Sequence, residues 1–391
     1  MAVARGETVV EGVEGVYHCT SRCVRRAFLC GRDSYTGKSF EHRKAWVRSR
    51  LEFLASVFAL EVWAFAVMSN HLHVVLGTRP DWVEQWSDEE TARRWLLLFP
   101  KNKAPGADAA GPARAELDAL AGISGKIGEI RVRLSSVSWF MRCLNEPIAR
   151  RANREDGCKG RFWEGRFHCQ ALLDDSAVLA CMAYVDLNPV RAGAADSPQN
   201  SSVTSGYLRI KAQAARDGVK RASPVIDASV FHLEGALAPE QRPALPDRWL
   251  TPLDDEKSGP GQGRLAMSAE EYLELLSWTG RLLREGRKGT MPENLDQALV
   301  RFSIDRGNWP TLVESYGRLF FRAVGRPRAM TQAARNSGRR WLHGVRTSRS
   351  VFFSAGVGKN YIYARPDGHV FPARERLARK LIHGARSCSI F

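Results

Sequence analysis

Two apolar runs separated by only three residues constrain the fold of this chain more than any other feature. LEVWAFAV (60–67) and HLHVVLGT (71–78) both have strand length and are rich in β-branched or aromatic residues. The tripeptide MSN between them has the composition of a turn. We therefore predict an antiparallel hairpin that presents His71 and His73 on one face of its second strand.

The flanking segments predict strands and helices in a regular order. A strand over 16–24 and an amphipathic helix over 40–59 precede the hairpin, and a helix over 135–153 follows it. A bent strand over 160–173 and a helix ended by Pro189 complete the series. The first six elements follow the β-α-β-β-α-β order, so we predict an α+β fold with a ferredoxin-like antiparallel sheet, across which the last helix lies.

Changes in composition predict three parts. Residues 1–200 form the first domain, and 79–134 are an insertion in it because a Pro-, Gly- and Ala-rich stretch interrupts the pattern. Residues 201–268, rich in Pro, Ser, Ala and Gly, predict a linker with room for one short helix. Helical periodicity returns over 269–391, which predicts a mostly helical C-terminal domain.

The charge of the chain narrows the class of partner. The formal net charge is +16, which favours a polyanion, and nucleic acid is the first candidate. Between 317 and 350 the chain has nine arginines and no acidic residue, with Phe320 and Trp341 interleaved, so we predict that the C-terminal domain contacts DNA. These arginines are Arg318, Arg322, Arg326, Arg328, Arg335, Arg339, Arg340, Arg346 and Arg349.

Other sequence features concern location and cofactors. No stretch approaches the roughly 18 apolar residues of a membrane-spanning helix, and the first residues have no apolar signal core, so we expect a cytoplasmic protein. None of the eight cysteines forms a C-x-x-C pair, which argues against a structural zinc site and favours free thiols. A P-loop of the G-x-x-x-x-G-K-[ST] type does not occur.

Four residues are candidates for chemistry. His71 and His73 project together from a strand and make half of a metal site, although two solvent-facing histidines give the same pattern. Tyr184 and Asn188, four residues apart on the predicted last helix, lie about a turn apart on one face. The Asn188 carboxamide oxygen beside two imidazoles suits Mg or Mn, and a metal that polarises a phosphate compensates for the poor nucleophilicity of tyrosine. A core tyrosine and a helix-terminal asparagine are the structural alternative.

Three segments resemble the REP-associated tyrosine transposases, which are single-tyrosine transposases of the HUH superfamily. They are MSNHLHVVL (68–76), GRFWEGRF (160–167) and YVDLNPVRAG (184–193), within a resemblance that spans residues 13–195. It implies a ferredoxin-like domain that recognises a folded hairpin in single-stranded DNA. The insertion and the region from 200 onward depart from the short family members, so the resemblance says little about the C-terminal half.

The resemblance also implies a role for each candidate. His71 and His73 bind the divalent metal, Asn188 completes the site, and Tyr184 attacks the scissile phosphate. A 5′-phosphotyrosine and a free 3′-hydroxyl result, and this covalent intermediate preserves the bond energy for rejoining to another strand without ATP. The expected function is a transposase that cleaves and rejoins single-stranded hairpin DNA.

Basic and aromatic residues near these motifs are predicted to contact the DNA. The arginines would line a phosphate track, and Trp163 would stack on an unpaired base, although a place in the core is equally compatible with its sequence context. Asp174 and Asp175 fit helix capping better than metal ligation. The predicted DNA-binding set is Arg150, Arg151, Arg154, Arg161, Trp163, Arg166 and Arg191.

Two other functions agree with parts of the sequence. A non-catalytic or RNA-directed binding module would keep the fold for regulation, but the presence of all four active-site candidates argues against lost activity. A replication-initiator or relaxase nickase shares the H-x-H strand and the tyrosine. The absence of a helicase motif and the presence of NPVRAG favour the transposase.

Overall fold

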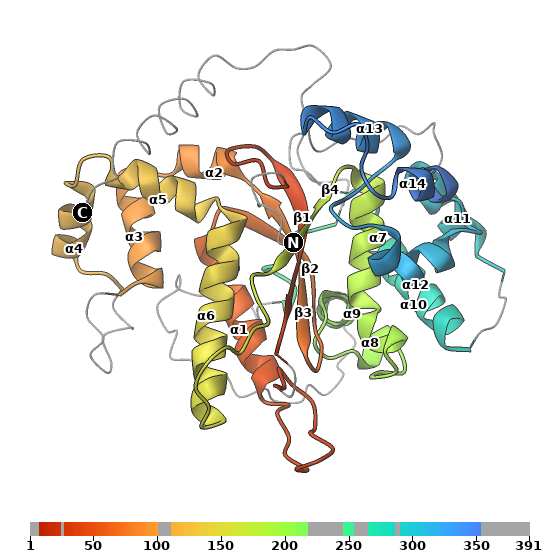
Figure 1. The fold of residues 1–391 in the computed structure, drawn as a ribbon, viewed down its shortest axis with the longest axis horizontal. Helices are drawn as coiled ribbons and strands as arrows, with labels where there is room; N and C mark the ends of the chain where they lie inside the picture. The colour runs from red at the N-terminus through yellow and green to blue at the C-terminus, as the bar shows by residue number, and fades with distance from the viewer. Residues whose placement is uncertain are drawn as a thin grey trace.

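The computed structural model describes residues 8–24, 27–100, 111–217, 245–253, 265–285 and 290–352. They form an α+β fold around a single five-stranded sheet (Figure 1). The strands are β1 (Gly15–Arg22), β2 (Leu60–Val67), β3 (His71–Thr78), β4 (His168–Leu172) and β5 (Ala323–Val324). Their spatial order is β2-β3-β1-β4-β5.

The predicted hairpin is confirmed. Strands β2 and β3 pair antiparallel, and the Met68 amide donates to the His71 carbonyl at 2.8 Å to close the turn between them. Strand β1 pairs antiparallel with both β3 and β4. The strand predicted over 160–173 is shorter than expected, because only His168–Leu172 joins the sheet.

The prediction of a purely antiparallel sheet is wrong. Strand β5 pairs parallel to β4, so the sheet is mixed. Residues 320–325 are mostly apolar, which does not distinguish a strand from the end of a helix. The edge of β4 that faces away from β1 has backbone groups that need hydrogen-bond partners. The amides of Ala171 and Leu173 donate to the carbonyls of Arg322 and Val324, both at 2.8 Å, and this draws the C-terminal chain onto the sheet.

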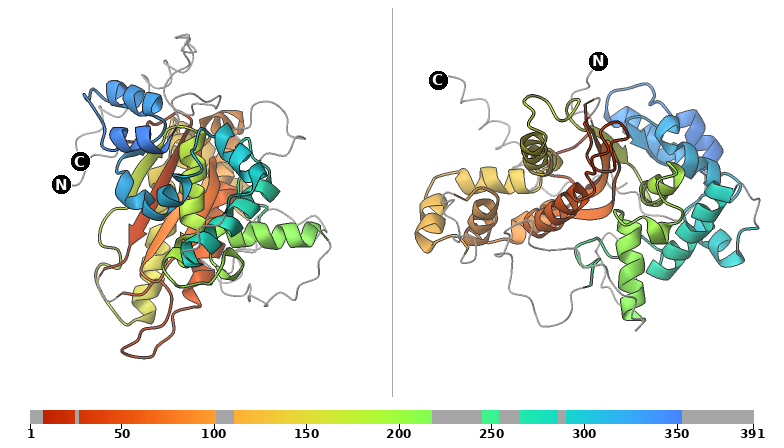
Figure 2. Two further views of the ribbon diagram at one scale, coloured as in Figure 1. Left: turned by 90° about the vertical axis from the view of Figure 1, so that its right-hand side faces the viewer. Right: turned by 90° about the horizontal axis from the view of Figure 1, so that it is seen from below.

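Helices α1 (Arg43–Val57) and α6 (Val137–Glu155) pack against each other and cover one face of the sheet (Figures 1 and 2). Leu51 of α1 and Phe140 of α6 are fully buried in one core with Leu72 and Val74 of β3. The predicted insertion adds four helices that extend this core. They are α2 (Pro80–Gln85), α3 (Asp88–Leu98), α4 (Arg114–Ala121) and α5 (Lys126–Leu134).

Helix α7 (Asp175–Asp186) lies on the opposite face of the sheet. Its N-terminus is capped as predicted, because Asp174 Oδ1 accepts from the Ala177 amide at 3.0 Å. Eleven of its twelve residues are buried, and Tyr184 is the exception. The expectation that Asn188 lies on the same helix is wrong: α7 ends at Asp186, and Asn188 begins the short helix α8 (Asn188–Arg191), because Pro189 favours a helix start.

The C-terminal helices share the core of α7. Leu275, Leu295 and Leu312 are fully buried in the same cluster as Val178 and Met182 of α7. These helices are α10 (Ala269–Glu285), α11 (Glu293–Arg301), α12 (Trp309–Leu319) and α14 (Val345–Val351). Helix α13 (Pro327–Asn336) packs in the other core, with α1 and α6, where its Met330 is fully buried. The rest of the predicted C-terminal domain, 353–391, is outside the described residues.

The predicted linker contributes to the fold as well. It contains helix α9 (Ser205–Arg216), and the Ser205 hydroxyl accepts from the Phe65 amide of β2 at 3.0 Å. Further along, the Thr251 amide donates to the Val62 carbonyl at 2.8 Å. The described ends of this segment therefore pack on β2. Residues 218–244 and 254–264 of the segment are outside the described residues.

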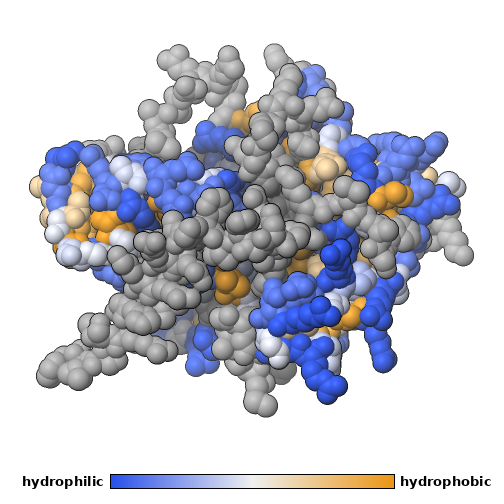
Figure 3. Space-filling view, turned by 90° about the horizontal axis from the view of Figure 1, so that it is seen from above, coloured by the Kyte–Doolittle hydropathy of each residue, from blue (hydrophilic) through white to orange (hydrophobic). Residues whose placement is uncertain are grey.

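Hydrophilic and apolar residues are distributed unevenly over the surface. On the face in Figure 3, the side that contains the C-terminal helices is largely hydrophilic, whereas apolar residues gather on the lobe of the insertion helices.

The seven cysteines of the described part are free, as predicted, and six of them are buried while Cys158 is exposed. Among the described helices, none has the length and apolarity to span a membrane.

A buried carboxylate connects α7 with the helices that follow it. Asp186 accepts from the Gly206 amide at 2.7 Å, from the Tyr272 hydroxyl at 2.7 Å and from the Ser205 hydroxyl. Burial raises the pKa of Asp186 above its usual range, and the bonds from Ser205, Tyr272 and Gly206 act against this rise. This single side chain thus joins α7, α9 and α10.

Replacing Asp186 by alanine is expected to destabilise the whole fold. Two or more buried donors lose their acceptor, and each costs about 1–3 kcal/mol, so the free energy of unfolding should fall by about 3 kcal/mol or more. Urea unfolding followed by circular dichroism measures this. The control is Asp196→Ala, which removes an exposed ion pair with Arg284 and should cost about 1 kcal/mol at most. Equal losses in both variants would contradict the assignment.

Candidate active site

A group of polar side chains occupies the sheet face that α7 covers. Side chains alternate along a strand, so these residues share the face of Val16 and Val75, which lie in the core around α7. The strand register places Thr20 opposite His73 and His18 opposite Gln170. The polar group is His18 and Thr20 of β1, His71 and His73 of β3, and His168 and Gln170 of β4.

His73 lies at the centre of this group. Its Nδ1 is 2.8 Å from Nε2 of His18 and 3.2 Å from the Thr20 hydroxyl. Its Nε2 is 3.0 Å from the side-chain amide of Asn188, across from the sheet. His73 is buried, so these partners satisfy both nitrogens of a ring that has little access to water.

His71 stands beside His73 at the more exposed end of β3. The two ring centroids are 4.9 Å apart. Nδ1 of His71 lies 2.7 Å from Oδ1 of Asn70. An amide oxygen only accepts, so Nδ1 carries the proton and Nε2 of His71 keeps its lone pair.

Tyr184 completes the cluster from α7. Its ring meets the ring of His73 edge-on, with centroids 5.6 Å apart, and that of His18 at 6.0 Å. The fold therefore brings the pair His71 and His73 together with Tyr184 and Asn188, which lie more than 100 residues further along the sequence. The predicted positions converge on one place, with Tyr184 the one partly exposed residue of an otherwise buried helix.

His18 is a member of the cluster that sequence reasoning missed. Its signal was the alternation of His18 and Thr20 in an otherwise apolar strand, which marks one face of that strand as polar. Burial lowers the pKa of His18 to about 4 and that of His71 to about 4, and it also lowers the pKa of His73. The three rings are therefore neutral at pH 7, the form in which imidazole binds a metal.

Helix α12 contributes residues that the sequence gave no reason to place here. The ring of Tyr316 stacks on that of Tyr184, with centroids 4.9 Å apart and planes 28° apart. The guanidinium of Arg191 lies 4.5 Å from the centroid of the same Tyr184 ring. Arg191 Nη2 also donates to the Glu314 carbonyl of α12 at 2.5 Å.

Of the seven predicted DNA-binding residues, Arg191 alone contacts this cluster in the described structure. Arg150 pairs with Glu146, and Arg151 lies 4.0 Å from the Trp46 ring. Both are on α6, on the other side of the sheet. Trp163 is partly buried, and its indole nitrogen donates to the Asn145 carbonyl at 2.9 Å. Arg154, Arg161 and Arg166 are exposed, and their contact with DNA stays a prediction.

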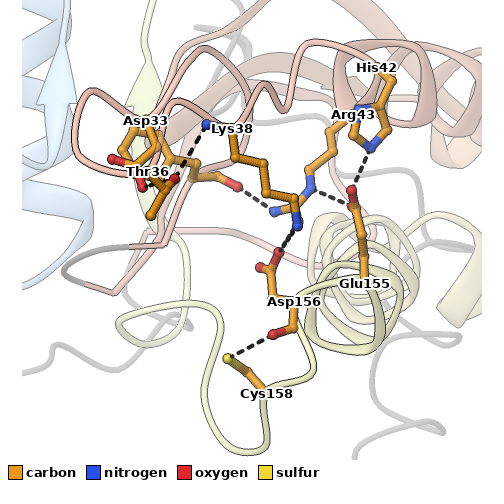
Figure 4. A network of polar contacts seen from close by, with 9 residues as sticks. Asp33, Thr36, Lys38, His42, Arg43, Glu155, Asp156 and Cys158 are labelled. Carbon is orange, nitrogen blue, oxygen red and sulfur yellow. Dashed lines mark hydrogen bonds and ion pairs between the residues drawn. The ribbon is translucent and has the colours of Figure 1, made fainter.

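An ion-pair network supports the strand end that carries His71 (Figure 4). Arg43 is fully buried, and it pairs with Glu155 at 2.8 Å and with Asp156 while donating to the Phe28 carbonyl at 2.6 Å. The next residue, Leu29, donates its amide to the Ser69 carbonyl at 2.7 Å. The network thus ties the β1–α1 connection to the end of α6, and that connection holds the turn before His71.

A metal site at this place has to use more than one residue type. Within the ranges that the structure describes, no group of three or more His, Cys, Asp or Glu side chains is arranged to hold a metal ion. The Asn188 amide lies beside this histidine pair, 3.0 Å from Nε2 of His73.

Neither a protein-family model nor a curated protein matches the chain. Among solved structures, the chain is similar to a REP-associated tyrosine transposase bound to a REP hairpin, with a TM-score of 0.31 and 13% sequence identity. The alignment covers 61% of this chain and 100% of that one. The similarity is distant.

Proposed function

We propose that the chain is a metal-dependent DNA endonuclease and strand transferase of the HUH type, which acts on single-stranded hairpin DNA in transposition. The observation that carries this proposal is the meeting of Tyr184 with the His71–His73 pair at one sheet face. The order of β1 to β4 with α1 and α6 agrees with the ferredoxin-like pattern of that class. The motifs that resemble the REP-associated tyrosine transposases support the same function.

The residues present fit a divalent metal. The Asn188 amide and Nε2 of His73 are 3.0 Å apart. An amide rotated by half a turn presents its oxygen instead of its nitrogen, and the two cannot be told apart by position alone. Asn188, His73 and His71 would hold Mg or Mn, and the ion would polarise the scissile phosphate.

His18 supports this assignment by its contact with the far nitrogen of His73. It lies against Nδ1 of His73, as Asn70 lies against Nδ1 of His71. When both partners accept from Nδ1, each ring would keep its Nε2 lone pair for a ligand. Partners of this kind on the far nitrogen are usual for metal-binding histidines, because they orient the ring and raise its basicity.

The proposed chemistry is a transesterification. A divalent ion at this site would withdraw electron density from the scissile phosphate. The Tyr184 oxygen forms a bond to phosphorus as the bond to the 3′ oxygen breaks, the tyrosine proton is released, and the 3′ oxygen takes up a proton. The 5′-phosphotyrosine that results is resolved when a 3′-hydroxyl of another strand attacks and Tyr184 leaves.

The charge of the C-terminal helices supports a nucleic-acid partner. Six of the nine predicted arginines are exposed, and Trp341 beside them is 69% exposed. Arginine side chains with an exposed aromatic ring suit phosphates and unpaired bases. The six exposed arginines are Arg318, Arg328, Arg335, Arg340, Arg346 and Arg349.

Replacing the nucleophile tests the proposal directly. Labelled single-stranded hairpin DNA and manganese are added to the wild-type chain and to Tyr184→Phe, and covalent adducts are resolved on a denaturing gel. We expect an adduct with the wild type and none with Tyr184→Phe. Tyr207→Phe, which changes a partly buried tyrosine of α9, should keep the adduct.

Three outcomes would reject parts of this assignment. An adduct that persists in Tyr184→Phe excludes Tyr184 as the nucleophile. Tight binding of REP-like hairpins without any adduct favours the non-catalytic binding module instead. An adduct on a replication or transfer origin but on no hairpin favours the nickase.

The metal ligands should be separable from DNA binding. His71→Ala is expected to abolish cleavage but to leave the Kd for hairpin DNA within about threefold, because phosphate contacts supply most of the affinity. Manganese binding, followed by electron paramagnetic resonance, should weaken in the same variant. A parallel collapse of DNA binding would mean that His71 is structural.

The arginine-rich helices should determine the salt dependence of binding. For the double variant Arg346→Gln/Arg349→Gln, the slope of log K against log salt should become shallower by about 0.7–0.9 for each phosphate that the protein no longer neutralises. The matched control is Arg114→Gln/Arg142→Gln, since both of these exposed arginines pair with acidic residues. If the two double variants give the same slope, the C-terminal arginines do not contact the backbone of the DNA.

A further inference from the structure

We infer that helix α12 is part of the active site, and that Tyr316 and Gly317 are positioning residues which hold the Tyr184 phenol for attack. The inference rests on the proposed function and extends it to the C-terminal half of the chain. Sequence reasoning assigned that half to DNA affinity alone. Three contacts with α12 support this positioning role.

The first contact is the ring of Tyr316. Tyr316 is fully buried, and its ring stacks on that of Tyr184 at a centroid distance of 4.9 Å. A partly exposed tyrosine near the end of a helix can otherwise occupy more than one side-chain rotamer. The buried Tyr316 ring blocks rotation of the Tyr184 side chain toward one side.

The second contact is the missing side chain of Gly317. A Cβ atom at this position would lie 3.0 Å from the Tyr184 hydroxyl oxygen, so the hydroxyl rests directly against the backbone of α12. Glycine is unfavourable inside a helix, so its presence at position 317 is best explained by close packing against another residue. Gly317 is exposed, so the Tyr184 hydroxyl is held where the helix meets solvent and DNA can approach.

The third contact runs through Arg191. Its guanidinium lies against the Tyr184 ring and donates to the Glu314 carbonyl, so α12 holds this group as well. The helix itself is firmly seated: Trp309 is fully buried, and its indole nitrogen donates to the Thr279 hydroxyl of α10 at 2.8 Å. A fixed α12 therefore defines the position of the phenol.

The test compares single-turnover adduct formation at saturating hairpin DNA in Gly317→Ala and Gly317→Val. Misplacing a reacting group by about 1 Å can cost about 100-fold in rate, so we expect at least a tenfold loss in Gly317→Ala and more in Gly317→Val. The Kd for DNA should stay within about twofold of the wild type. Alanine favours a helix over glycine, so a loss of rate in Gly317→Ala is not explained by unfolding of α12.

Further variants separate positioning from general packing. Tyr316→Phe keeps the ring and should keep the rate, whereas Tyr316→Leu should lose it. Thr311→Ala is the matched control, because Thr311 is an exposed residue of the same helix. A wild-type rate in both Gly317 variants overturns the inference, and so does an equal loss in Thr311→Ala.

A measurement that does not need activity distinguishes this inference from the proposed function. With ¹³C-labelled tyrosine, the Tyr184 ring resonances, assigned through Tyr184→Phe, should shift in Tyr316→Leu and not in Thr311→Ala. Unchanged resonances in Tyr316→Leu overturn the contact itself. If the resonances shift in Tyr316→Leu but the wild-type chain forms no adduct, the contact is real and the proposed function is rejected. The positioning role is then rejected with it.

Discussion

The burial of helix α7 is the constraint on which the rest of the structure depends. Eleven of its twelve residues are buried, so neither the sheet nor the C-terminal helices alone can cover it. The sheet covers one side and α12 packs against another, while α10 and α11 belong to the same core. The C-terminal helices are therefore required to bury the helix that carries Tyr184, and the chain has one continuous core across that boundary.

The same burial determines the character of the polar cluster. Imidazoles under a covering helix lose water, so each must find a partner within the protein. His73 finds His18 and Thr20 at Nδ1 and Asn188 at Nε2. Burial also keeps the rings neutral by lowering their pKa values. One physical cause thus accounts for both the geometry of the cluster and the neutral state of its rings.

Much of the first half of the chain was predictable because its information is local. Strand alternation and the short MSN turn predict the hairpin and the shared face of His71 and His73, and the structure agrees. The error about Asn188 was also local: a helix break before Pro189 shifts the residue onto α8, yet the amide still reaches His73. The spacing of the residues was a better guide than the continuity of the helix.

What could not be predicted depends on contacts between distant segments. Strand β5 has only two residues, and its pairing follows from the open edge of β4 and not from its own composition. Tyr316 reads as an ordinary apolar residue of an amphipathic helix, because nothing in 309–319 indicates that α12 packs beside Tyr184. Such positions depend on which helix packs against which part of α7.

The sequence by itself determined the hairpin, the order of the first six elements, the basic charge and the four residues that meet at the candidate site. Period-2 alternation and turn chemistry act over a few residues, so they can be read without a fold. Only the tertiary structure decided that His18 lies against Nδ1 of His73 and that α12 lies against the Tyr184 phenol. Both depend on burial, which is a property of the assembled core and of no single segment.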